Sequence, residues 1–123
     1  MVQCSCGGDC KENLVMACSG VADVGELSDK VYRKLIKDGV GAGFCLAGVG
    51  ADISGFVQSA KAATNIVIDG CPVNCGKKII DKLGAEVKSF TLTKLMNLEK
   101  GKTPVTGELV EATVNKIREE LSK

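Results

Sequence analysis

Residues 65–75, with the sequence Asn-Ile-Val-Ile-Asp-Gly-Cys-Pro-Val-Asn-Cys, decide the fold of this 123-residue chain. Residues 65–68 form its clearest strand, a short apolar run that is typical of a parallel strand covered on both faces. The turn 69–74 follows, and a helical pattern then begins at Cys75 and stops at Gly84, a residue typical of a helix C-terminus. A strand that passes into a helix through so short a turn predicts a βα unit.

Similar units lie on both sides of this stretch. An apolar run predicts a strand at residues 14–18. Two further strands are predicted at residues 41–47, which are rich in glycine, and at 86–92, where Val87, Phe90 and Leu92 are the expected core positions. Apolar residues at helical spacing predict helices at residues 26–38, 54–63 with Ser54 as its N-cap, 75–83 and about 107–121. Alternating strands and helices predict an α/β fold, a Rossmann-like three-layer α/β/α sandwich with a mostly parallel four-stranded sheet in the order 2-1-3-4.

The chain has one domain's length and a globular composition, with 45% hydrophobic and 25% charged residues. We predict a single α/β metal-binding domain over residues 13–123. Residues 1–12 have no periodicity and contain three of the seven cysteines, which predicts a flexible Cys-rich N-terminal tail. Its thiols could hold a soft ion such as Zn²⁺ or Cu(I), or could supply a ligand to the domain; they are Cys4, Cys6 and Cys10.

Composition excludes several classes of function. The chain has no histidine, so no mechanism that needs an imidazole is available. A net charge of +1 and only four aromatic residues argue against nucleic acid as a partner. Neither a secretory signal nor a membrane span is visible, which favours a cytoplasmic protein. In that reducing compartment, seven cysteines indicate metal binding or redox chemistry more than disulfides.

Four cysteines follow the predicted strands at the same edge of the sheet. Cys18 ends the first strand, Cys45 lies late in the second, and both Cys71 and Cys75 follow the third. Ligands of open α/β sheets bind beyond the carboxyl ends of the strands, at the point where the strand order reverses. Four thiolates suit Zn²⁺, so the sequence predicts zinc bound by Cys18, Cys45, Cys71 and Cys75, with a role in metal handling or metal-dependent regulation.

The turn after the third strand favours thiolate chemistry. Pro72 and Asn74 are residues typical of a helix start, where exposed N–H groups stabilise anions, and Lys77 and Lys78 add positive charge nearby unless they only form a solvated face. Asp69 is expected either to cap the turn or to hydrogen-bond to the ligands. Cys18 and Cys45 also have a simpler interpretation as apolar packing.

Three blocks of the sequence together resemble the DGC domain family, named for its central Asp-Gly-Cys motif. They are residues 17–20 (Ala-Cys-Ser-Gly), 45–51 (Cys-Leu-Ala-Gly-Val-Gly-Ala) and 68–75 (Ile-Asp-Gly-Cys-Pro-Val-Asn-Cys), and the resemblance extends over roughly residues 14–121. Members are described as zinc-binding proteins with four chelating cysteines. The resemblance implies that these are Cys18, Cys45, Cys71 and Cys75, and it supplies no reaction.

Two alternatives to zinc handling remain open, and whether the protein is an enzyme is open with them. The first is a thiol redox or sulfur-carrier protein, in which Cys71 or Cys75 attacks a disulfide or persulfide. The second is a hydrolase with an open three-cysteine zinc site and Asp69 or Asp52 as base. A homodimer is a further expectation, because so small a domain covers its apolar surface incompletely.

Overall fold

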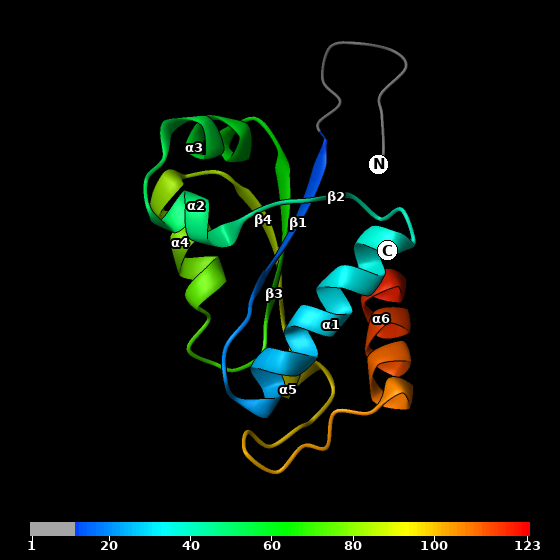
Figure 1. Ribbon diagram of the computed structural model, residues 1–123. Helices are drawn as coiled ribbons and strands as arrows, with labels where there is room; N and C mark the ends of the chain where they lie inside the picture. The colour runs from blue at the N-terminus through cyan, green and yellow to red at the C-terminus, as the bar shows by residue number, and fades with distance from the viewer. Residues whose placement is uncertain (1–11) are drawn as a thin grey trace.

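The computed structural model, which describes residues 12–123, contains a four-stranded parallel sheet (Figure 1). Its order is β2-β1-β3-β4, as predicted. The two central strands each have six residues and pair along their full length, because both are apolar runs buried on both faces. The strands are β1 (Asn13–Cys18), β2 (Ala42–Gly43), β3 (Thr64–Asp69) and β4 (Glu86–Thr91).

Helices cover both faces of the sheet and form the outer layers of the predicted sandwich (Figure 1). One face packs against α1 (Asp23–Lys37), α5 (Leu92–Leu95) and α6 (Gly107–Leu121). The other packs against α2 (Leu46–Gly50), α3 (Ser54–Lys61) and α4 (Cys75–Leu83). Successive strand residues point to opposite faces, so Val15 belongs to the first core whereas Leu14 and Met16 belong to the second. The α/β sandwich is therefore confirmed.

The second strand is much shorter than the predicted residues 41–47. Only Ala42 and Gly43 pair with β1, opposite Leu14 and Val15. Glycines weaken a strand, and the chain leaves the sheet halfway along β1 to form α2, a helix that the sequence analysis missed. The short helix α5 was missed as well.

The N-cap predicted for the helix at residues 54–63, which is α3 of the structure, is wrong. Ser54 is the first residue of α3 itself, and Ile53 occupies the N-cap position without a side-chain hydrogen bond. The helix ends at Lys61 instead of residue 63, because Ala63 turns into β3. The final helix has the predicted bounds, and Val114 and Ile117 on its apolar face are buried.

The predicted tail, with Cys4, Cys6 and Cys10, lies outside the described residues except for Glu12. The Glu12 carbonyl accepts a hydrogen bond of 2.9 Å from the Thr64 N–H group at the start of β3. Between Glu12 and Lys123, no helix has the length and apolar character needed to cross a membrane.

Candidate metal centre

Three of the four predicted cysteines meet at the carboxyl edge of the sheet. Cys18 is the last residue of β1 and lies opposite Asp69, the last residue of β3. Cys71 follows Asp69 by two residues, and Cys75 is the first residue of α4. Together Cys18, Cys71 and Cys75 line one cavity of about 270 Å³. The edge predicted from the strand ends is therefore where these three thiols gather.

Close backbone contact brings the β3–α4 turn to the start of α1. A β-carbon at Gly70 would overlap the backbone of Val24, and one at Gly25 would lie 2.7 Å from the Gly20 nitrogen. Only glycine permits so close an approach of two backbones. The Gly of the Asp-Gly-Cys motif thus lets the turn that carries Cys71 lie against the segment that follows Cys18.

Asp69 fixes the position of Cys75. Its side chain is 1% exposed, and its two oxygens accept the backbone N–H groups of Gly76 at 2.9 Å and Lys77 at 3.0 Å. A carboxylate is well placed there, because the first N–H groups of a helix lack partners within the helix. Of the two roles expected for Asp69, the structure therefore shows the cap.

Asn74, which the sequence analysis placed at the helix start, occupies the N-cap position of α4, but its side chain makes no capping hydrogen bond. Its backbone is left-handed, with φ at 56°, and its Oδ1 accepts a hydrogen bond of 2.7 Å from the Thr91 hydroxyl. Asn tolerates this conformation better than most residues. The side chain consequently ties the turn to the end of β4.

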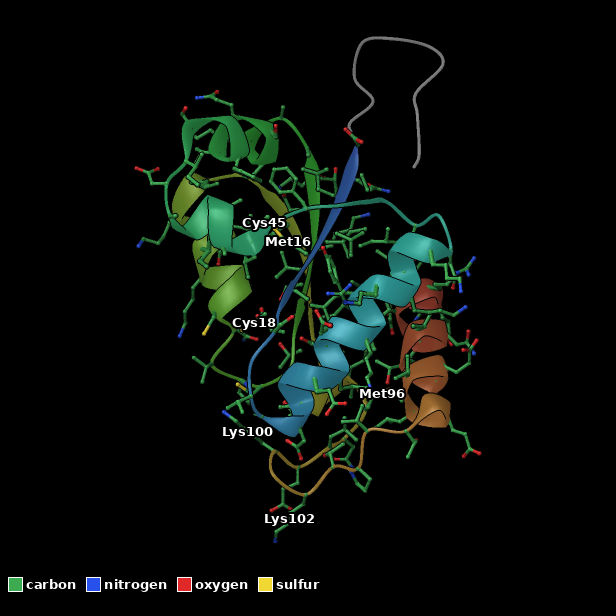
Figure 2. The ribbon with its side chains drawn as sticks, in the orientation of Figure 1. Met16, Cys18, Cys45, Met96, Lys100 and Lys102 are labelled. Atoms are coloured by element: carbon green, nitrogen blue, oxygen red, sulfur yellow. The ribbon has the colours of Figure 1, made fainter. Side chains whose placement is uncertain are left out.

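Cys45 lies apart from Cys71. Because β2 ends at Gly43, Cys45 leaves the sheet before the edge row and becomes the N-cap of α2, where its Sγ accepts the Gly48 N–H at 3.4 Å. Figure 2 shows Cys45 where the chain enters α2, separated from Lys100 on the far side of Cys18. Cys45 lines a second cavity of about 440 Å³, and Cys18 and Cys75 line this cavity too. The two cavities therefore share two thiols.

The electrostatic environment opposes thiolate formation at Cys18. Burial, followed by the nearby Cys75, Asp69 and Cys71, raises the pKa of Cys18 to about 11. A hydrogen bond between the Cys18 and Cys75 side chains adds to this effect. Across residues 12–123, the side chains as they lie form no group of three or more His, Cys, Asp or Glu arranged to hold a metal ion. The thiols are neighbours but are not gathered around one point.

A cation that the sequence analysis missed contacts the Cys71 thiol. Lys100 lies on the loop after α5, and its Nζ donates to Cys71 Sγ at 3.7 Å. Lys77, which the sequence favoured, instead forms an ion pair of 2.6 Å with Asp81, and Lys78 is exposed. No local pattern could identify Lys100, because it lies 29 residues from Cys71 in an irregular segment.

The fold and the site define an α/β protein with cysteines gathered at the carboxyl edge of a parallel sheet. A model of the DGC domain family matches residues 14–117, and the chain belongs to this family. It is also similar to the anaerobic and virulence modulator AnvM of Pseudomonas aeruginosa, with 37% identity over 65 residues. That match covers 52% of this chain and 50% of AnvM, so it spans about half the length of this relative. No solved structure matches.

Proposed function

We propose that this protein binds zinc through Cys18, Cys71 and Cys75, with Cys45 as the fourth ligand, and that it acts in metal handling or metal-dependent regulation. The observation that supports this most is the cavity at the sheet edge, which three thiols from two separate strand ends line together. Turns with close backbone contacts position the backbone of these cysteines, so that only side-chain movement would be needed to form the site.

The chemistry of the donors fits zinc. Thiolates favour borderline-soft and soft ions over Mg²⁺ or Ca²⁺. A bound cation would also offset the repulsion from Cys75, Asp69 and Cys71 that, together with burial, disfavours thiolate at Cys18 in the metal-free protein. Binding requires rotation of thiol side chains between their staggered conformations, and Cys45 must give up its hydrogen bond with Gly48. When bound, zinc supplies a structural link between the strand ends.

A regulatory role has support from the relative. AnvM is named as a modulator, and the shared segment is half of each chain. A protein that changes shape or partner when it gains or loses an ion would fit such a name. The site's thiols lie at an edge with exposed positions such as Cys75, where an incoming ion has access.

Neither of the two bases expected for the hydrolase alternative is placed to activate water. Both oxygens of Asp69 accept backbone N–H groups, and the side chain is buried. Asp52 is not among the residues that line either thiol cavity. Among residues 12–123, the one carboxylate that lines a thiol cavity is Asp29, which is hydrogen-bonded to Arg33 and Ser19, so the geometry gives no support to the activation of water.

A thiol redox function is the second candidate, because Cys18 and Cys75 are in hydrogen-bond contact. The pair would exchange with a disulfide of another molecule, forming the Cys18–Cys75 disulfide and releasing two thiols, so that two electrons pass to the partner. This pair is one form of the Cys71 or Cys75 attack expected from the sequence, with Cys75 as the attacking thiol and its neighbour Cys18 as the thiol that resolves the mixed disulfide.

The decisive experiment is metal analysis with a parallel count of free thiols, on protein purified without added metal. Serine at Cys4, Cys6 and Cys10 restricts the count to the domain. We expect about one zinc per chain and its loss in Cys18→Ser or Cys75→Ser. Val73→Ser, in the same turn but without a donor to lose, should keep the metal. A fully reduced protein that takes up neither Zn²⁺ nor Co²⁺ would overturn the metal proposal, and rapid formation of a Cys18–Cys75 disulfide would favour the redox one.

A further inference from the structure

Lys100 is the only charged side chain, within the described part of the chain, that lines the cavity of Cys18, Cys71 and Cys75. Its Nζ lies 3.7 Å from Cys71 Sγ, although the lysine is exposed and could extend into solvent. The rest of the cavity wall is mostly glycine, alanine and valine. A single cation beside a thiol in an otherwise apolar wall has a strong effect on which ligands that thiol meets.

The loop that carries Lys100 is fixed to the rim of the same cavity. Asp23, the first residue of α1, accepts the Gly101 N–H at 2.9 Å with one oxygen and the Thr103 N–H at 2.8 Å with the other. Gly101 has φ of +90°, a conformation that favours glycine and turns the chain so that both N–H groups face Asp23. These contacts join residues about 80 positions apart and place Lys100 over the thiols.

The neighbouring charges leave Lys100 free for this role. Glu99 forms an ion pair of 3.5 Å with Lys102, on the same loop. The Asp69 carboxylate accepts hydrogen bonds from the first turn of α4, and the Asp23 carboxylate accepts them from the loop backbone. Lys102 does not line the cavity, and Figure 2 shows it further out on the loop than Lys100. It is therefore a matched control for the charge of Lys100.

We infer that Lys100 is a functional residue of this cavity, a cationic latch that Asp23 positions over Cys71. The latch favours anionic ligands at Cys71 over neutral ones. With zinc bound, which rests on the function proposed above, its charge offsets the excess negative charge of several thiolates, and its side chain obstructs a competing ligand. Movement of the Lys100 side chain away from Cys71 would then precede the loss of a bound ion.

The first test uses metal-free protein and two alkylating reagents, anionic iodoacetate and neutral iodoacetamide. Mass spectrometry gives the ratio of their rates at Cys71, in which the reactivity of the thiol itself cancels. We expect Lys100→Gln and Asp23→Asn to lower this ratio about fivefold, on the scale of one unit charge near the sulfur. Lys100→Arg should restore the ratio, and Lys102→Gln should leave it unchanged. An unchanged ratio in Lys100→Gln, or an equal loss in Lys102→Gln, overturns the inference.

The second test measures the rate at which zinc passes from loaded protein to a chelator. Lys100→Gln and Asp23→Asn should each release zinc about fivefold faster, whereas Lys102→Gln should not. Equal rates in all variants would show that Lys100 does not control the release of zinc. A protein that takes up no zinc but shows the expected alkylation ratios would end the proposed function and leave the latch as a selector of anions at Cys71.

Discussion

The two cavities at the sheet edge share Cys18 and Cys75 but have different walls. On the Cys71 side, the walls are backbone turns held by the Gly70 contact with Val24 and by the Asp69 cap. On the Cys45 side, the walls include side chains on the surfaces of α1, α2 and α4. There the Tyr32 hydroxyl donates to the Phe44 carbonyl at 3.3 Å, and an exposed ion pair joins Arg33 to Asp29.

The difference indicates that the thiol on the Cys71 side is held more rigidly than the thiol on the Cys45 side. Backbone contacts and a buried carboxylate allow the Cys71 side little freedom, since any shift would leave polar groups without partners or force backbone overlap. The Cys45 side depends on a weak bond to sulfur and on exposed side chains, which rearrange at low cost. We therefore expect the Cys71 side to define the site and the Cys45 side to adapt to it.

The strongest test of this contrast removes the cap of α4. Asp69→Ala leaves the N–H groups of Gly76 and Lys77 without their acceptor, and the free energy of unfolding should fall by about 3 kcal/mol. Urea denaturation measures this change. Asp81→Ala, on the same helix, removes only an exposed ion pair and should cost less than about 0.5 kcal/mol. Equal losses in the two variants would mean that the turn is no better fixed than the surface.

Removal of one thiol from each cavity compares the two sides directly. Cys71→Ser should weaken zinc binding about thirtyfold more than Cys45→Ser, because a pre-positioned ligand contributes more to affinity than one that must first give up a hydrogen bond. Competition with a chromophoric chelator measures both affinities. If the loss is the same for both variants, the two sides contribute equally and the contrast fails.

Much of the fold could be predicted because its centre is strongly patterned. Residues 14–18 and 65–68 are short apolar runs, and the strands they predict became the two buried central strands in the predicted order. The ends of these strands placed Cys18, Cys71 and Cys75 at one edge. The early end of the second strand could not be seen, because apolar residues 44–46 continue the pattern of residues 41–43 and only tertiary packing decides where the strand stops.

The parts of the site that the sequence left open or did not reveal depend on contacts beyond the local pattern. The cap was one of two roles expected for Asp69, and the choice depends on N–H groups seven and eight residues away, across a turn that the Asn74 backbone shapes. Lys100 reaches Cys71 because Asp23 holds its loop, and this contact joins segments with no shared motif. Local propensity describes such loops poorly, since their conformation comes from the partners that they meet.

The raised pKa of Cys18, which lines both cavities, should give a smaller effect on thiol reactivity and on stability, and this effect depends on pH. Its value of about 11 exceeds the ordinary 9.0, so Cys18 should react with iodoacetamide at pH 8 about tenfold more slowly than an unperturbed thiol. A thiol whose pKa is raised by folding stabilises the protein below pH 9, and this contribution is lost as the pH rises towards 11.

Thermal unfolding of metal-free protein between pH 8.5 and 10.5 tests whether ionisation of Cys18 lowers the stability of the folded state. The unmodified chain should lose more stability over this range than Cys18→Ser, which has no thiol to ionise at that position. A parallel loss in both proteins would show that Cys18 is not the group that couples folding to pH.

The smallest effect is expected from the N-terminal segment. Six residues of β1 span about 20 Å, from the opposite edge of the sheet to Cys18. The segment before Asn13 therefore joins the sheet at the edge away from Cys18. Deletion of residues 1–11 should leave zinc affinity within about twofold, as judged by the same chelator competition. A larger loss, reproduced in the full chain by serine at Cys4 and Cys6, would mean that a tail thiol takes the position we assign to Cys45. The adaptable side of the site would then belong to another segment of the chain.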